Sequence, residues 1–421
     1  FHGLYFPKQI EDISLSPLFL ERKKWEEIRN VSEKVIRLFE KIFNYLEGLK
    51  PGYLLSTSGL HPDAYRFFTK NSKEKRDIGR IARPDILLYN GNPFVIELNV
   101  GSSLGGILDI HEIAQFFANS PMARELEKSI PIWTNSPMVS MAQFLKSYAK
   151  ENGLPDPPRV GILEWDFGVE INYRYAATLT SLGVPSAFMN PDLCSFKNGK
   201  LYFQNLPIDI GIKHFHISDL DFPEDTPFIE SLFQGTENFG TSLLAHEDST
   251  LMSDKRLMGY LYEYQEILSS FEKEFLFKHI PWTCVLEKET VVSYRGEKWK
   301  IEKLLDPRFR SEFLMKPGPG LQGKGIVVGK DCTPSVWERE AQIALDTGRF
   351  ILQKFYKADT QSLPFLKAGK LQYLECPIIL GPFVIDYKAD GGIFVRYTKD
   401  RGETIINYHR GSHTTCCFIE N

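Results

Sequence analysis

Two short stretches near the start of the chain contain the residue types that bind a divalent cation. The first is Arg83-Pro-Asp85 and the second is Glu97-Leu-Asn99. Apolar runs over 85–89 and 93–100 flank Asn90-Gly91, which predicts a hairpin because both turn positions must tolerate positive φ. On strands, Glu97 and Asn99 project from one face, and Asp85 can lie across from them.

Two carboxylates and an amide oxygen form an oxygen-only ligand set. Such a set suits Mg²⁺, which takes carboxylates together with substrate phosphates. Arg83 is two positions from Asp85 and should point to the same place, as a cation that neutralises charge on a transferred phosphoryl group. A solvated surface hairpin is the alternative. Glu97, however, lies in an apolar run, where a buried carboxylate would need a charged or hydrogen-bonding partner.

A second segment, Phe313 to Gly329, has the pattern of a strand ending at Lys316, a glycine-rich loop and another apolar strand. Glycines let backbone N–H groups approach phosphate oxygens closely, and the lysine adds a point charge. The segment is not a Walker A loop, because a strand rather than a helix follows it. A plain hairpin loop is the alternative to a phosphate-binding loop.

A third segment is an apolar strand from Phe350 that ends in polar and aromatic residues, at Gln353, Lys354, Phe355 and Tyr356. Backbone groups and a ring edge at such a strand end could receive a purine. Taken alone, the segment is only a strand terminus.

The elements that must position these segments follow from the apolar spacing. Residues 17–49 have the spacing of an amphipathic helix that stops near Gly48 and Pro51. After a proline-rich linker at 154–158, strand, helix and strand patterns indicate a small α/β unit with a parallel sheet. Its expected elements are strands at 159–164, 183–188 and 209–213, a helix at 171–182 and a hairpin at 197–200. Residues 252–279 and 335–347 have helical patterns, and short strands dominate after about 282.

The chain has 421 residues, which predicts two or three domains. Its composition, 43% apolar and 25% charged, is that of a globular protein and excludes disordered, collagen-like and coiled-coil chains. A net charge of −4 argues against an extended basic surface for nucleic acid but allows a local basic site. No apolar run approaches the ~20 residues that span a bilayer, and the first residues lack a signal-peptide pattern. We therefore expect a cytoplasmic protein that binds neither nucleic acid nor a membrane.

The cysteines and histidines give no strong metal motif. None of the six cysteines forms a C-x-x-C pair, so we expect reduced thiols. The best zinc candidate is His214-x-His216, and two ligands without partners make a weak site.

Together the three segments resemble the ATP-grasp ligases, the superfamily of D-alanine–D-alanine ligase and glutathione synthetase. In an ordinary ATP-grasp chain the Glu-x-Asn hairpin comes last, whereas here it lies more than two hundred residues before Lys316. The α/β unit resembles the domain that usually opens such chains, and Asp254-Lys255 resembles the start of the nucleotide-binding part. The chain therefore resembles a circularly permuted ATP-grasp protein, similar to the peptide ligases and amino-acid–carrier-protein ligases of natural-product pathways.

The resemblance implies an α/β fold with a lid and a helical N-terminal addition. The expected parts are a helical region at 1–80, a metal-binding hairpin part of the core at 81–150, a small α/β domain at 155–250, a nucleotide-binding lid domain at 251–355 and the remainder of the core at 356–421.

The resemblance also implies roles for individual residues. The metal ligands for Mg²⁺ would be Asp85, Glu97 and Asn99, and the catalytic cations would be Arg83 and Arg396. The ATP phosphates would be bound by Lys316, by Lys255 or alternatively Lys288, and by the loop glycines Gly318, Gly320, Gly323 and Gly325.

The remaining implied contacts concern the nucleoside and the substrate. Adenine would be received at Gln353, Lys354, Phe355 and Tyr356, with ribose near Asp359. Gln353 stands where the common pattern has Glu, so backbone oxygens would contact the adenine amino group. Lys213 stands where permuted relatives often have Arg. We expect Ser102, Ser103 and Gly105 to border the acceptor or carboxylate pocket, with a plain helix-entry loop as the alternative.

The function implied is an ATP-dependent carboxylate–amine ligase that forms an acyl phosphate and releases ADP and phosphate. Its substrate would be an amino acid or peptide. A carboxylate–thiol ligase that loads an amino acid onto a carrier protein, a kinase-like phosphotransferase and a non-catalytic nucleotide-binding homologue are the alternatives. Whether the chain forms a homodimer is left open by the sequence.

Overall fold

The computed structural model describes residues 13–68, 78–165, 168–198, 200–217, 230, 232, 240–245, 247–320, 325–407 and 411–420. Gly323 lies outside the described residues, so the glycine-rich loop is described at its two ends.

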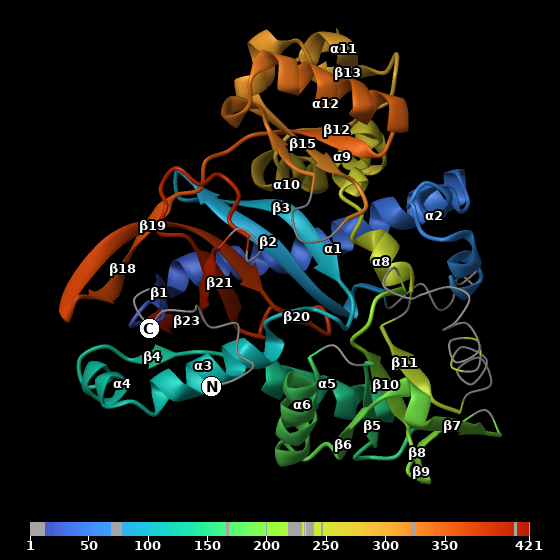
Figure 1. Ribbon diagram of the computed structural model, residues 1–421, viewed down its shortest axis with the longest axis vertical. Helices are drawn as coiled ribbons and strands as arrows, with labels where there is room; N and C mark the ends of the chain where they lie inside the picture. Colours follow the sequence, from blue (N-terminus) through green and yellow to red (C-terminus); the bar gives the residue numbers. More distant parts are fainter. Residues whose placement is uncertain are drawn as a thin grey trace.

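An antiparallel sheet forms the middle of the molecule (Figure 1). Its strands, in spatial order, are β20 (Val384–Ile385), β2 (Ile81–Tyr89), β19 (Lys370–Pro382), β21 (Ile393–Tyr397) and β22 (His413–Thr415), with β3 (Asn92–Val100) paired to β2 and β18 (Thr360–Lys367) paired to β19. The β2–β3 hairpin confirms the predicted turn, because Asn90 has φ 50° and Gly91 has φ 74°. Its register sets Asp85 opposite Glu97.

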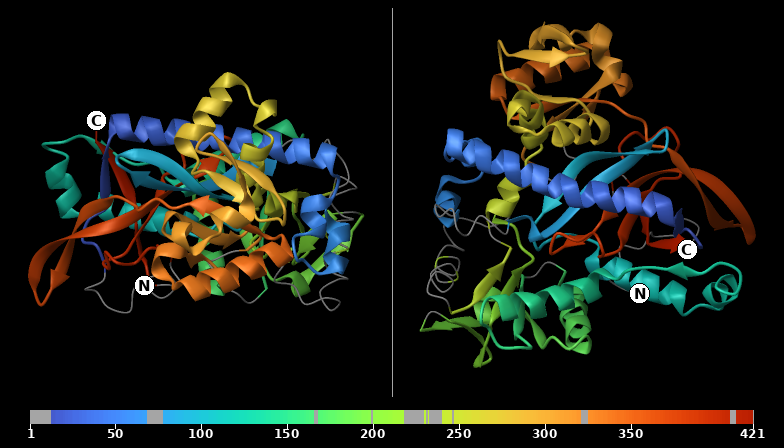
Figure 2. Two further views of the ribbon diagram at one scale, coloured as in Figure 1. Left: turned by 90° about the horizontal axis from the view of Figure 1, so that it is seen from above. Right: turned by 180° about the vertical axis from the view of Figure 1, so that it is seen from behind.

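Helix α1 (Arg22–Leu49) covers one face of this sheet (Figure 2). The predicted amphipathic helix is confirmed, and the apolar positions Trp25, Ile28, Val31, Val35, Leu38, Phe39, Ile42, Phe43 and Leu46 are all buried. The start of the apolar run forms a strand instead, β1 (Leu18–Glu21). It pairs in parallel with β23 (Cys417–Glu420), which also pairs with β4 (Ile132–Trp133). Strand pairing with the other end of the chain therefore overrides helical spacing here.

A second core cluster joins the central sheet to another group of helices. These helices are α3 (Ile107–Ala118), α4 (Pro121–Leu126), α5 (Pro137–Glu151) and α6 (Val169–Ser181). Ile81 belongs to this second cluster and its neighbour Ala82 to the cluster under α1, as the alternation of side chains along a strand requires.

The predicted α/β unit is confirmed as a parallel sheet. Its order is β11 (Ser242–Leu244), β10 (Ile210–Lys213), β5 (Val160–Leu163) and β6 (Ser186–Met189). A small antiparallel sheet beside it contains β7 (Cys194–Lys197), β8 (Lys200–Phe203) and β9 (Leu206–Pro207).

Residues between 256 and 354 build the part drawn at the top of Figure 1. Its sheet has the order β12 (Thr283–Val285), β17 (Phe350–Lys354), β15 (Phe313–Pro317) and β16 (Val327–Val328), beside a hairpin of β13 (Val291–Tyr294) and β14 (Glu297–Lys300). Its helices are α9 (Arg256–Glu263), α10 (Ser270–His279), α11 (Ile301–Leu304) and α12 (Pro334–Thr347). Helix α8 (Asp248–Met252) precedes this part and contacts β3 and α1.

The continuous helical pattern predicted over 252–279 is wrong. The Asp254 carboxylate accepts a hydrogen bond from the Arg256 backbone N–H (2.9 Å), and this local bond replaces a helical turn between α8 and α9. Ser269 and Glu272 form a capping box that starts α10 afresh.

Short helical segments complete the described chain. They are α2 (Tyr53–Ser56) and 3₁₀ turns at Pro62–Phe67, Pro191–Leu193, Gln265–Ile267, Pro307–Glu312 and Gly329–Asp331. None of the helices in the described ranges combines the length and apolar character needed to cross a membrane.

Candidate functional site

Asp85 lies at the centre of a buried cluster of charges. Its Oδ2 atom is 2.5 Å from a guanidinium nitrogen of Arg396 on β21, and its Oδ1 atom is 3.7 Å from Nε of Arg83. The three side chains are at most 10% exposed. Burial alone would raise the pKa of Asp85, but the charges of Arg396 and Arg83 outweigh it and hold that pKa below its ordinary value. The carboxylate is therefore ionised between two cations.

Two lysines from the second half of the chain extend this cluster to Glu97. Lys255 Nζ is 3.1 Å from Glu97 Oε1 and donates to the Gly320 carbonyl (2.8 Å). Lys316 Nζ donates to the Ile96 carbonyl on β3 (3.2 Å), although the two residues are 220 positions apart. Burial lowers the pKa of Lys316 to about 8, and Glu97 opposes that shift. The predicted hairpin and glycine-loop segments thus meet at one place.

The residues expected to hold Mg²⁺ are Asp85, Glu97 and Asn99, and the state of their oxygen atoms decides whether a cation fits. Within the described chain, the buried Oδ1 atom of Asp85 accepts no hydrogen bond. The Asn99 amide nitrogen donates a hydrogen bond to the Arg83 carbonyl (3.1 Å). The amide oxygen, which a cation would bind, takes no part in that hydrogen bond. No group of three or more His, Cys, Asp or Glu side chains in the described residues could hold a metal. Two carboxylates and an amide oxygen fit Mg²⁺, which completes its shell with phosphates and water.

The two ends of the glycine-rich loop require glycine for different reasons. A Cβ on Gly318 would lie 2.6 Å from Cγ of Arg256 and 2.7 Å from Oδ1 of Asp254. Gly320 and Gly325 have φ 141° and 74°, which side chains rarely adopt. The Gly318 carbonyl accepts a hydrogen bond from the Lys255 backbone (3.1 Å), so the loop begins against the segment that carries Lys255.

Gln353 does not present its side chain to a ligand. It is 1% exposed, and its Oε1 atom accepts a hydrogen bond from Lys316 Nζ (3.0 Å) while Nε2 donates to Thr283 (3.2 Å). The Gln353 side chain therefore holds Lys316 in place. Adenine binding by backbone groups of this strand end stays a prediction.

Tyr356, at the end of this segment, packs on the hairpin. The Tyr356 ring lies 4.7 Å from that of Tyr89 and 4.6 Å from that of Phe94. Lys354 Nζ lies over Tyr356 (5.3 Å), and Lys330 Nζ lies over Phe355 (5.0 Å).

Asp359 is engaged at the hairpin turn. Its two carboxylate oxygens accept hydrogen bonds from the backbone N–H groups of Asn90 (3.0 Å) and Gly91 (2.8 Å). The structure thus gives Asp359 a role in holding the turn, and its contact with ribose stays a prediction.

The loop before α3 connects the charge cluster to the α/β unit. The Gly105 carbonyl accepts a hydrogen bond from Arg83. Ser102 Oγ donates to the Lys213 carbonyl (2.6 Å), and Ser103 Oγ lies 2.8 Å from Nε2 of His216. The same segment also leads into α3, as the alternative of a helix-entry loop predicts, because Gly106 is the N-cap of that helix.

Other candidates lie in structural contacts. Lys213 forms a buried ion pair with Glu247. Lys288 is 60% exposed and pairs with Asp346 (2.6 Å), so Lys255 is the better candidate of the two lysines. His214 Nδ1 lies 2.7 Å from Oδ1 of Asn172, and burial lowers the pKa of His214 to about 4.

Sequence reasoning missed the pair that flanks Lys255. Arg256 is fully buried, with Nε and a terminal nitrogen bound to the Asp254 carboxylate at 2.6–3.1 Å. The adjacent opposite charges in Asp254-Lys255-Arg256 are the signal that could have indicated it.

No family model and no curated protein matches the chain. Among solved structures, it is similar to a glutathione synthetase-like effector from Globodera pallida, with 11% identity over 97% of this chain and 90% of that one and a TM-score of 0.56. A putative γ-glutamylcysteine synthetase from Methylobacillus flagellatus has 12% identity, coverage of 96% and 90%, and a TM-score of 0.46. D-alanyl-alanine synthetase A from Vibrio cholerae has 12% identity, coverage of 53% and 66%, and a TM-score of 0.29. At these identities the first likeness shows the fold alone.

Proposed function

We propose that the chain is an ATP-dependent ligase of the circularly permuted ATP-grasp type, which joins a carboxylate to an amine through an acyl phosphate. The fold likeness to a glutathione synthetase-like protein over almost the whole chain supports the fold part of this proposal. The substrate would be an amino acid or a peptide.

The observation that carries the proposal is the convergence of charges around one hairpin. Asp85 and Glu97 face each other in the register of β2 and β3. Four cationic side chains contact or face these two carboxylates. Arg83 comes from the same strand as Asp85, and the other three, Arg396, Lys255 and Lys316, come from other parts of the fold. Such an excess of positive charge in a buried place suits a polyphosphate, because a triphosphate supplies the negative charges that two carboxylates leave unmatched.

The chemistry needs no nucleophile from the protein. The substrate carboxylate attacks the γ-phosphorus of ATP, a new P–O bond forms, and the bond to the bridging β–γ oxygen breaks with release of ADP. The amine then attacks the acyl carbon, a C–N bond forms, phosphate leaves with the C–O electron pair, and the nitrogen loses a proton to water.

The residues of the chain bind and orient the reacting groups. Lys255 and Lys316 hold phosphate oxygens, and Arg83 and Arg396 stabilise the charge that develops on the transferred group. Mg²⁺ bound by Asp85, Glu97 and Asn99 would neutralise part of the negative charge of the phosphates. The loop with Ser102, Ser103 and Gly105 borders the acceptor.

The test is a screen of amino acids and dipeptides with ATP and Mg²⁺. We expect release of ADP and phosphate, and trapping of an acyl phosphate as a hydroxamate when hydroxylamine is present. A kinase would give ADP without free phosphate, and a thiol ligase would need a carrier protein for product. Absence of nucleotide turnover and of nucleotide binding would contradict the proposal.

Glu97→Gln tests the metal assignment. Its side chain is more exposed than Asp85, at 19% against 7%, so the protein should stay folded while ADP formation falls roughly 100-fold. Glu297→Gln, on the exposed β13–β14 hairpin, is the matched control and should keep full turnover. Equal rates in the two variants would remove the metal site from the proposal.

A further inference from the structure

The buried guanidinium of Arg256 has a partner in the N-terminal region. Arg256 lies at the first position of α9, and its outer nitrogen donates to Thr57 Oγ1 at 2.7 Å. Two other guanidinium nitrogens bind Asp254, so Thr57 supplies the acceptor that the carboxylate does not reach. A fully buried cation needs every such partner, because an unpaired donor costs the whole desolvation of that group.

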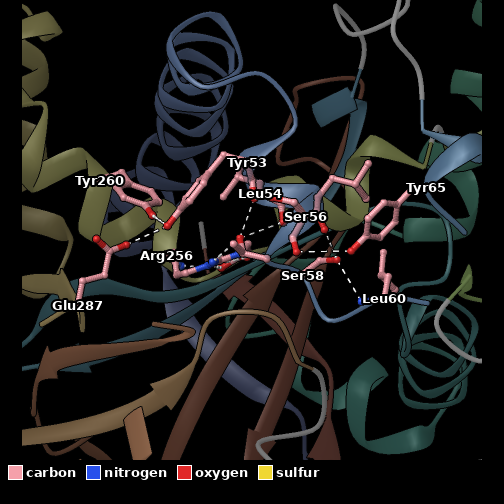
Figure 3. A network of polar contacts seen from close by, with 12 residues as sticks. Tyr53, Leu54, Ser56, Ser58, Leu60, Tyr65, Arg256, Tyr260 and Glu287 are labelled. Atoms are coloured by element: carbon pink, nitrogen blue, oxygen red, sulfur yellow. Dashed lines mark hydrogen bonds and ion pairs between the residues drawn. The ribbon is translucent and has the colours of Figure 1, made fainter. Parts of the chain in front are cut away.

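Thr57 is itself held on both sides. It follows α2, and its hydroxyl donates to the Tyr53 carbonyl (2.8 Å). The Tyr53 hydroxyl donates to Glu287 (2.9 Å) and accepts from Tyr260 on α9 (3.3 Å). Figure 3 shows Tyr53 beside Arg256, Tyr260 and Glu287. The turn after α1 is therefore connected to the nucleotide-binding part by several bonds.

The other end of this network reaches the candidate phosphate site. Lys255 stands between Asp254 and Arg256, and its ammonium contacts Glu97 and the Gly320 carbonyl. The Gly318 Cα lies so close to the Asp254–Arg256 pair that a Cβ would overlap both. A shift of the pair would displace Lys255 and the first glycine of the loop together.

We propose that Thr57 is a positioning residue for the nucleotide phosphates: it fixes Arg256, which with Asp254 fixes Lys255 and the start of the glycine-rich loop. This inference rests on the proposed function, because it assigns the N-terminal region a part in the same site. A residue that only helps packing would affect stability alone. A positioning role for Thr57 means that nucleotide affinity depends on its hydroxyl even when the fold is intact.

The experiment measures ADP affinity by titration calorimetry and the melting temperature for each full-length variant. Thr57→Val keeps the shape and removes the acceptor, and we expect ADP affinity to fall about tenfold, as loss of one charge-assisted hydrogen bond implies. Thr57→Ser keeps the hydroxyl and should bind within twofold of wild type. Arg256→Lys keeps the charge beside Asp254 but loses the branch toward Thr57, and the same tenfold loss is expected.

Ser58→Ala is the matched control, because Ser58 Oγ bonds only within the same turn among the contacts described, to the Leu55 carbonyl and the Leu60 N–H. It should leave ADP affinity unchanged. Wild-type affinity in Thr57→Val and Arg256→Lys, or an equal loss in Ser58→Ala, overturns the inference while the proposed function stands. Failure of wild type to bind ADP overturns both.

Discussion

Lys316 is a buried ammonium held by two neutral oxygens, the Ile96 carbonyl and the Gln353 amide. With its pKa lowered to about 8, it is charged at neutral pH and loses its proton as the pH rises through 8. If only the charged form binds phosphate, ADP affinity should fall about tenfold from pH 7 to pH 9. Lys316→Arg stays charged and should flatten this dependence. Calorimetric titrations at the two pH values check it, and Lys298→Met, on an exposed strand, should keep the wild-type slope.

Asp85 balances two buried guanidinium groups, so its neutralisation should cost stability as well as activity. Asp85→Asn leaves Arg83 and Arg396 without their shared counter-charge. Breaking a buried pair in this way costs about 3 kcal/mol. Urea unfolding of the variant without nucleotide measures the loss. Glu97→Gln should lose much less, and equal stabilities of the two variants would argue against the central role of Asp85 in the cluster.

At this scale the sequence predicted which residues converge but not every direction in which they point. Alternation along a hairpin places Asp85 opposite Glu97 without knowledge of the rest of the fold. Gln353 was expected near a ligand, and its side chain turns inward to Lys316 and Thr283 because β17 lies between β12 and β15. That direction depends on strands distant in sequence, which a local pattern does not contain.

At the scale of elements, apolar spacing predicted α1, α6 and α12 well and failed where side chains compete with the helix. The segment over 252–279 has helical spacing throughout, yet Asp254 and Ser269 bind backbone N–H groups and break it. The break has a consequence for the site. It leaves Lys255 at the start of α9, from which its side chain reaches Glu97.

Gly318 tests the contact between this break and the glycine-rich loop. In Gly318→Ala the new methyl group would overlap Arg256 and Asp254, so a shift of the buried pair or of the loop is required. Overpacking of this kind costs about 1–3 kcal/mol, and ADP affinity should fall with it. Chemical unfolding and calorimetry measure both. Gly48→Ala, in the last turn of α1 where a Cβ meets nothing within 4 Å, should be neutral or slightly stabilising.

At the scale of the whole molecule, the family resemblance of the three segments predicted that distant parts of the chain share one site. It did not predict which elements join those parts. Helix α1 is one such element. It contacts β2 and β3 of the hairpin, α8 and α9 on either side of Lys255, and β23 near the C-terminal end. Its apolar face is part of the same core cluster as the hairpin and α9. Burial of one long helix therefore holds the two halves of the candidate site together.

Phe39, near the middle of α1 and 1% exposed, tests this role. Phe39→Ala should lower the free energy of unfolding by about 3–5 kcal/mol, since it removes a large buried ring and leaves a cavity. Because Phe39 lies in the core and not among the charges, ADP affinity of the protein that remains folded should stay within twofold of wild type. Urea unfolding followed by circular dichroism gives the first quantity, and calorimetry well below the unfolding midpoint gives the second. Lys34→Ala, on the exposed face of the same helix, should change stability by less than about 0.5 kcal/mol. A similar small change in Phe39→Ala would mean that α1 contributes far less to the common core than its burial implies.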